Sequence, residues 1–216
     1  MFGRLLLIAL FSLSLEMNAH AAFAANDLSC EIFRPAVKGV LARCEGPSRT
    51  HNSIAIELIG HAPNAVSEVR LTGGDGNFRQ TLKLTAEPLI DIETVGILHM
   101  DFNFDGFEDF AIMEFLPAGP NVPYLYYLHD SQTDRFTPNA DLARITAPEF
   151  RATDGQIISY WRDSAAVSGK DVYVWKDGKP QLKSRSEERR SGTDCIRTHY
   201  LQRDGKLTEL SKDACE

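Results

Sequence analysis

The motifs that define several large enzyme classes are missing from this sequence of 216 residues. It contains no H-E-x-x-H zinc-protease motif, no G-x-S-x-G nucleophile turn and no phosphate-binding P-loop. The segment Gly74-Asp-Gly76 sits inside a turn and does not open a helix, so it is no dinucleotide-binding loop. Many Asp and Glu residues are present, but a sequence does not show the carboxylate separation that glycoside hydrolysis requires. The sequence therefore favours a protein without catalytic activity of its own.

Histidines are few and scattered one at a time. Five of the six lie beyond residue 24, and each is expected to be a half-buried strand residue or a solvent contact rather than a catalytic base. These residues are His51, His61, His99, His129 and His199.

Long apolar runs are confined to the N-terminus. Arg4, the apolar stretch 5–15 and small-residue sites at 19–21 and 22–24 predict a signal peptide over residues 1–24, and hence a periplasmic or secreted protein. No later run approaches the ~18 residues that a membrane-spanning helix needs. Removing one Arg and one Glu with the leader keeps the net charge at −7. Such a negative charge argues against a general nucleic-acid binder.

Cysteine is rare, and all four cysteines lie beyond the predicted leader. An even number in an exported protein favours two disulfides, for which three connectivities are open. We predict the pairs Cys30–Cys44 and Cys195–Cys215, because each brackets a short segment with a turn near its middle. A zinc site is the alternative, but no C-x-x-C occurs and no histidine stands at ligand spacing from a cysteine pair.

Helical periodicity is nearly absent, whereas Asp-Gly pairs recur between segments rich in Val, Ile, Tyr, Thr and Trp. That pattern is typical of β-hairpins. We expect hairpins over residues 172–183 and 195–210, and strands at 53–59, 68–71, 81–84, 96–100, 110–115 and 124–129. Short helices are expected only at 138–145 and around Glu187. The sequence thus predicts one mostly β domain of antiparallel hairpins over residues 25–216.

Charge is spread unevenly along the chain. Residues 87–154 contain thirteen acidic and three basic residues, a net of −10, whereas residues 170–203 contain nine basic and five acidic residues, a net of +4. Solvated faces of exposed strands and a functional electrostatic asymmetry both account for this pattern.

An acidic motif lies between two of the expected strands. The pattern D-x-N-x-D-G-x-x-D occupies residues 101–109, and Ile112 stands where an EF-hand places a bidentate Glu. We therefore predict a structural Ca²⁺ loop that joins β-strands. An acidic turn without metal is the alternative, although its close carboxylates would repel one another unless something neutralised them. The predicted ligands are Asp101, Asn103, Asp105, the carbonyl oxygen of Phe107 and Asp109.

Two further segments can present side chains to a partner. Residues 116–124 contain three prolines and a glycine between expected strands, and residues 159–173 place small and polar residues between two strand-like ends. Loops of this kind can enter the cleft of another protein. Ordinary connections with core aromatic residues at either end are the alternative.

Five segments in order resemble one protein family. They are residues 98–112, the L-P-A-G-P-N-V-P-Y-L-Y run at 116–126, the strand–loop–strand segment 158–175, the hairpin at 175–179 and the hairpin at 195–207. Together they resemble exported, calcium-loop, β-propeller-like proteins that include immunity proteins of antibacterial type IV secretion systems. They are more loosely similar to periplasmic lysozyme inhibitors. The resemblance covers residues 80–210.

The resemblance implies a propeller-like arrangement and a non-catalytic protein that binds and occludes a lysozyme-like peptidoglycan hydrolase. The loop 162–170 is then expected to enter the cleft of the hydrolase. Its proposed partner-binding residues are Arg162, Asp163, Ser164, Ser168 and Lys170. Two other functions stay open, a calcium-stabilised adhesion or scaffold module of the cell envelope and an envelope enzyme.

Overall fold

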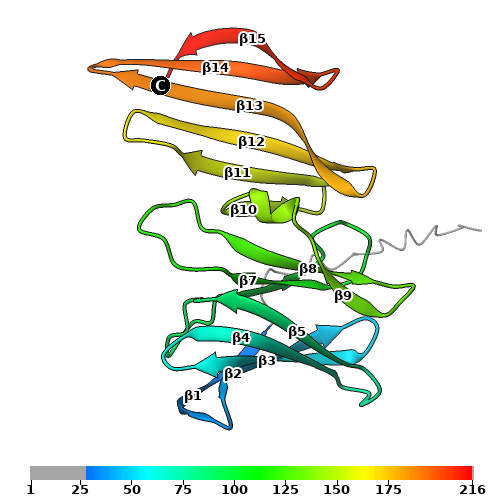
Figure 1. Ribbon diagram of the computed structural model, residues 1–216. Coiled ribbons are helices and arrows are strands. Elements are labelled where there is room, and N and C mark those ends of the chain that lie inside the picture. The colour runs from blue at the N-terminus through cyan, green and yellow to red at the C-terminus, as the bar shows by residue number, and fades with distance from the viewer. Residues whose placement is uncertain (1–27, 216) are drawn as a thin grey trace, which may run out of the picture.

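The chain folds into three antiparallel β-sheets that follow one another in sequence (Figure 1). The computed structural model describes residues 28–215, so the signal peptide predicted for residues 1–24 lies outside the described residues. Among residues 28–215, no helix is long and apolar enough to cross a membrane. The prediction of a mostly β protein is confirmed.

Each sheet is a meander, because its strands are hydrogen-bonded in chain order. The N-terminal sheet contains β1 (Ser29–Val37), β2 (Val40–Ser48), β3 (Asn52–His61), β4 (Ala65–Gly73) and β5 (Arg79–Ala86). The middle sheet contains β6 (Ile97–Met100), β7 (Asp109–Met113), β8 (Tyr124–Asp130) and β9 (Arg135–Pro138). The C-terminal sheet contains β10 (Pro148–Arg151), β11 (Gln156–Arg162), β12 (Val167–Lys176), β13 (Lys179–Ser191), β14 (Asp194–Arg203) and β15 (Lys206–Ala214).

One of the two expected short helices is present. A 3₁₀ helix, η1 (Leu142–Arg144), lies within the expected segment 138–145. The helix expected around Glu187 is wrong, because Glu187 lies in β13, between Gly169 of β12 and Thr198 of β14. Strand pairing on both sides satisfies the backbone of this polar segment, and such tertiary pairing overrides helix propensity.

The Asp-Gly pairs set two of the hairpins in the C-terminal sheet. Asp177 and Gly178 have φ of 52° and 74°, and Asp204 and Gly205 have φ of 48° and 79°. Two consecutive left-handed residues form the type I′ turn, whose twist matches that of the paired strands. The local sequence therefore determines the register of β12 with β13 and of β14 with β15.

The middle sheet is covered on both faces. Phe110 and Ile112 of β7 belong to a core shared with the N-terminal sheet, whereas Ala111 belongs to a second core with Ile157 of the C-terminal sheet. All five residues of β7 are buried, which explains the apolar run 110–113 that follows Asp109. Figure 1 shows the three sheets stacked in a row. The described residues close no ring of sheets, so the propeller-like arrangement is not confirmed.

Both predicted disulfides are present. Cys30 and Cys44 are opposite each other in the β1–β2 ladder, and Cys195 of β14 is joined to Cys215 at the end of β15. The described residues contain no free cysteine, so the alternative of a cysteine zinc site is not supported. Disulfides of this kind are compatible with an exported protein.

Candidate functional site

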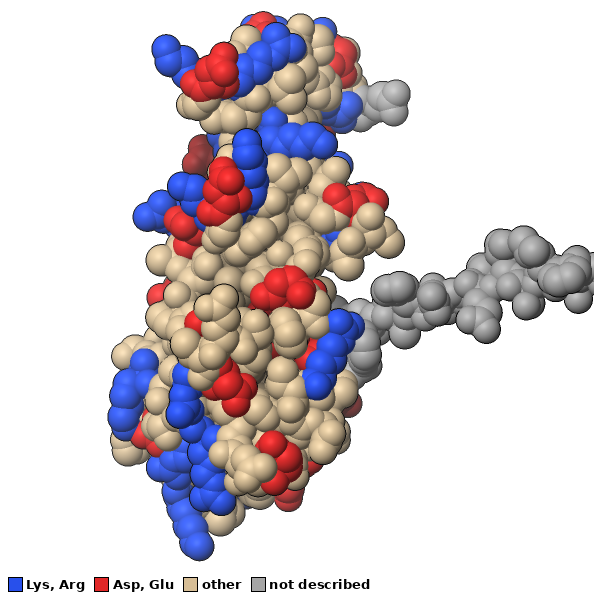
Figure 2. Space-filling model, turned by 90° about the vertical axis from the view of Figure 1, so that its right-hand side faces the viewer, with Lys and Arg blue, Asp and Glu red and all other residues tan. Residues whose placement is uncertain are grey.

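A groove of about 830 Å³ runs over the C-terminal sheet, and we call it the basic groove. Two rows of paired residues line it. Tyr160, Lys170, Ser186 and His199 stand opposite one another across β11 to β14, and Arg162, Ser168, Glu188 and Arg197 form the neighbouring row. Figure 2 shows acidic and basic side chains interspersed on one face of the molecule, whose upper part is the C-terminal sheet.

Cationic side chains outnumber acidic ones in the groove. Arg185 is held by Asp171, whose buried carboxylate accepts bonds from Nε at 2.7 Å and from Nη2 at 2.6 Å. The same guanidinium lies 5.2 Å from the ring of Trp161. Arg197 donates to Glu188 at 2.7 Å, and this bond is the main cause that lowers the pKa of Glu188. These two arginines are therefore fixed by partners of their own.

Arg162 is different, because it is exposed at the end of β11 and its guanidinium has no bonding partner among residues 28–215. Its backbone is nevertheless held firmly. The Asn121 side chain donates to the Arg162 carbonyl at 2.8 Å and accepts from the Arg162 amide at 3.0 Å. Asn121 thus replaces a neighbouring strand and anchors the proline-rich segment 116–124 to this edge. Arg162 presents a free charge on a rigid support.

The loop expected over residues 162–170 is shorter in the structure. Strand β12 begins at Val167, so Ser168 and Lys170 lie in a strand and only residues 163–166 form the loop. The Val167 carbonyl accepts from the amides of Asp163 and Ser164, and the Ser164 hydroxyl accepts from the amide of Val167 at 3.1 Å. Strand pairing continues further because Gly169 leaves room for the Trp161 ring. Three of the five predicted partner-binding residues, Arg162, Ser168 and Lys170, line the basic groove.

Arg185 and Arg197 were not predicted from the sequence as functional residues. The only sequence feature that pointed to them was the excess of basic residues between positions 170 and 203. That excess did not show which side chains share one face, because register across β12, β13 and β14 decides it.

The acidic motif at residues 101–109 forms a tight loop between β6 and β7. Asp101 accepts hydrogen bonds from the amides of Asp105 at 3.1 Å and Gly106 at 2.8 Å, and Asn103 accepts from Asp105 at 3.1 Å. Asp105 accepts from the amide of Phe107 at 2.9 Å. These bonds turn the three side chains into the loop, and oxygen donors of this kind suit a hard cation such as Ca²⁺.

Asp109 lies at the base of this loop and is fully buried. Its carboxylate accepts from the amides of Phe102 and His129, each at 2.8 Å. Burial raises its pKa well above the usual range, and the charges of Asp105 and Asp101 add to this effect. Burial also raises the pKa of Asp101. A bound dication would offset the cost of keeping these carboxylates ionised, so the residues present fit the predicted ion.

We expect replacement of Arg197 by Gln to raise the pKa of Glu188 toward its ordinary value of 4.5. The folded-state pKa is lowered, so the stabilising effect of the pair is present above pH 4.5 and is lost as the pH falls through the lowered value. NMR titration of the Glu188 carboxyl carbon measures the shift. An unchanged pKa in Arg197→Gln would show that Arg197 does not hold Glu188.

Comparison with known proteins gives one structural relationship. No protein-family model and no curated protein matches the sequence. A solved structure described as "a Xanthomonas Type IV Secretion System related protein" superimposes with a TM-score of 0.55. The two chains are 19% identical, and the match covers 86% of this chain and 95% of the other. At this identity, the similarity establishes that the two proteins share a fold.

Proposed function

We propose that this protein is an exported, non-catalytic inhibitor that binds a lysozyme-like peptidoglycan hydrolase and occludes its cleft. The observation that carries the proposal is Arg162, a rigidly held, exposed arginine without a partner among the described residues, at the rim of the basic groove. The fold shared with a type IV secretion system related protein supports a role associated with such a system, and we propose that this role is that of an immunity protein.

The chemistry of the expected target suits such a residue. Lysozyme-like hydrolases use two carboxyl groups that flank the scissile bond. A guanidinium presents a planar fork of donors that matches a carboxylate in a bidentate manner. Asn121 already holds the Arg162 backbone in place, so binding has to order only the side chain of Arg162 and not the segment that carries it. Occlusion requires no catalytic group in the inhibitor.

The acidic excess of residues 87–154 would act at longer range. Many of these residues belong to the middle sheet and its loops, below the C-terminal sheet in Figure 1. If the target hydrolase is basic, this charge accelerates the encounter in a salt-dependent way. We propose that the three stacked meanders act like the blades of a propeller. They would form a rigid support for the basic groove and for the loop 163–166.

We expect Arg162→Ala to weaken inhibition by at least ~1 kcal/mol, about fivefold in Kd, if Arg162 is a hot spot of the interface. Asp163→Ala tests the adjoining loop, and Lys170→Ala should have a smaller effect, because lysine is depleted from interface centres. Arg144→Ala is the matched control, since Arg144 lies in η1 with its side chain 81% exposed, outside the groove. Calorimetric titration measures the Kd of each variant for the hydrolase, and muramidase assays measure the inhibition.

The panel of targets includes several lysozymes and the secreted hydrolases of competing bacteria, at low salt and with calcium. If the folded protein binds and inhibits none of them, the proposal is wrong, and the adhesion or scaffold function becomes the better one. Turnover of peptidoglycan by the protein alone would instead identify an enzyme.

We further propose that Ca²⁺ bound by the loop 101–109 stabilises the fold. Binding to the native state alone stabilises by about 2.7 kcal/mol at a hundredfold excess of ion over Kd. Asp105→Ala should remove most of this stabilisation, because Asp105 is one of the predicted Ca²⁺ ligands. Its side chain is exposed and bonds only within the loop, so the rest of the fold should be little affected. Asp154→Ala, at another exposed Asp-Gly turn, is the control. Scanning calorimetry with calcium and with chelator compares the melting temperatures, and calorimetric titration measures Ca²⁺ binding. Equal melting temperatures and no binding would contradict the proposed Ca²⁺ site.

A further inference from the structure

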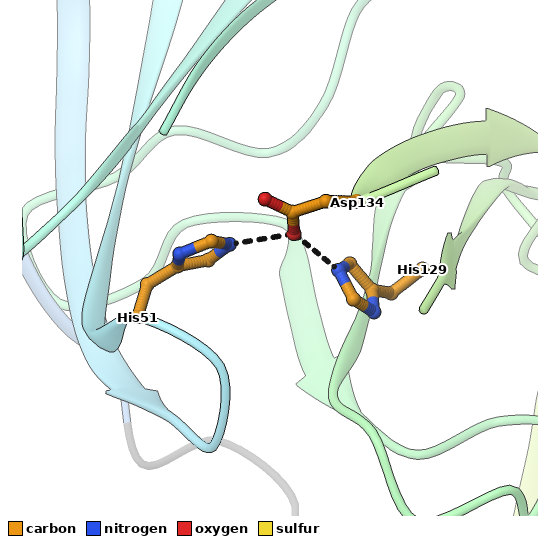
Figure 3. Close-up of side chains that lie close together, drawn as sticks. All are labelled: His51, His129 and Asp134. Atoms are coloured by element: carbon orange, nitrogen blue, oxygen red, sulfur yellow. Dashed lines mark hydrogen bonds and ion pairs between the residues drawn. The ribbon is translucent and has the colours of Figure 1, made fainter. Parts of the chain in front are cut away.

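Two histidines and an aspartate that are distant in sequence converge where the N-terminal and middle sheets meet (Figure 3). His51 belongs to the turn between β2 and β3, His129 to β8, and Asp134 to the turn between β8 and β9. The Nε2 atoms of His51 and His129 lie 3.0 Å and 3.1 Å from the same oxygen, Oδ1 of Asp134. The Figure 3 view shows both rings directed at this one carboxylate oxygen.

We infer that His51, His129 and Asp134 form a binding site for Zn²⁺. The three ligand atoms lie within 4.8 Å of one another. Ligand atoms that bind a tetrahedral zinc ion at ~2.0–2.1 Å are ~3.3 Å apart, close to the two separations found here.

The imidazole rings are held in fixed orientations by aromatic neighbours. His51 stacks on Phe78 with ring centroids 4.5 Å apart, and His129 contacts Phe136 at 5.2 Å and Phe107 at 5.6 Å. The two imidazoles are 6% and 2% exposed. These aromatic neighbours shield the two imidazoles from solvent.

The remaining ring nitrogen of His51 supports a metal rather than hydrogen bonds alone. If both Nε2 atoms carry protons and donate to Asp134, each Nδ1 becomes a buried acceptor that has no hydrogen-bond donor among residues 28–215. With a metal at Nε2, each Nδ1 carries the proton instead. The Nδ1 of His51 then lies 3.7 Å from Oδ2 of Asp75, in the same order as the carboxylate–histidine–metal arrangement common in zinc sites. The Nδ1 of His129 has no such carboxylate among residues 28–215.

The types of ligand atom also indicate which metal ion the site would bind. Two imidazole nitrogens and one carboxylate suit Zn²⁺ and related transition metals, whereas Ca²⁺ and Mg²⁺ prefer oxygen ligands such as those of the loop 101–109. Asp134 is half exposed, with 51% of its side chain accessible, so solvent reaches the site from this side. Water or a group from a partner can supply the fourth ligand. The ion would connect the N-terminal sheet to the middle sheet.

The test uses the mature protein, stripped of metals and kept in saturating Ca²⁺ so that the acidic loop does not compete. Zn²⁺ is titrated by calorimetry, and Co²⁺ is added separately because its visible spectrum reports tetrahedral coordination. We expect one Zn²⁺ per chain and a melting temperature that rises with Zn²⁺. His51→Ala, His129→Ala and Asp134→Asn should each weaken Zn²⁺ binding at least about a hundredfold, the upper end of the loss seen when a residue that only hydrogen-bonds to a ligand is replaced.

Two controls keep the result interpretable. His61→Ala removes an exposed histidine elsewhere in the N-terminal sheet and should bind Zn²⁺ normally. Asp134→Asn keeps the shape of a half-exposed side chain, so it tests the site even if a histidine variant fails to fold. No Zn²⁺ binding by the folded protein, or unchanged binding in Asp134→Asn and the folded histidine variants, would overturn the inference. Neither outcome bears on hydrolase inhibition, which is measured separately.

Discussion

Replacement of Asp109 by Ala is expected to lower the free energy of unfolding by about 2–6 kcal/mol, even with calcium removed by chelator. Asp109 is fully buried, and its two carboxylate oxygens accept the amides of Phe102 and His129. Alanine leaves both buried N–H groups unpaired, at a cost of about 1–3 kcal/mol each. Denaturant unfolding followed by circular dichroism measures the change.

The effect separates the architectural role of Asp109 from metal binding. Asp105→Ala, in the same loop but exposed, should change stability little in chelator, because its bond to Phe107 lies in solvent. Asp109→Asn keeps one carbonyl acceptor and should fall between wild type and Asp109→Ala. A change below about 0.5 kcal/mol for Asp109→Ala would contradict the role that we assign to these two bonds.

Removal of the Cys195–Cys215 disulfide, by replacing both cysteines with Ser, is expected to cost about 3 kcal/mol. The bond closes a segment of sequence separation 20, and a loop of this length contributes about that much through the entropy of the unfolded chain. Strand β15 depends on it strongly, because all nine of its residues are exposed and it pairs only with β14. Chemical denaturation of the double variant measures the loss.

Hydrogen exchange shows where that loss occurs. The amides of β15 that are paired with β14 should exchange faster in the variant, while those of β7 in the buried middle sheet should keep their relative protection. The protein with both disulfides intact is the control. Unchanged protection in β15, together with unchanged stability, would show that strand pairing alone holds this edge.

Local residue chemistry predicted most of the fold. Asp-Gly pairs between segments rich in Val, Ile, Tyr, Thr and Trp located the hairpins 172–183 and 195–210, because a type I′ turn depends on only two residues with left-handed φ. The cysteine pairs were predictable for the same reason, since each bridges neighbouring strands. The helix expected around Glu187 failed where pairing with β12 and β14 decided the conformation.

The candidate sites also differ in whether local sequence or tertiary structure determines them. The acidic loop is contiguous, so its donor residues 101–109 were visible as a motif. The sequence by itself determined the leader pattern, this loop, most of the strands and the Asp-Gly turns, but not β1, β2, β9 and β10. Only the tertiary structure decided three other features. It set the short extent of the loop 163–166 and placed Arg185 and Arg197 together in the groove. It also brought His51 to Asp134, which lies 83 residues later in the sequence. The physical reason is that strand register and sheet stacking bring together residues whose separation carries no periodic signal.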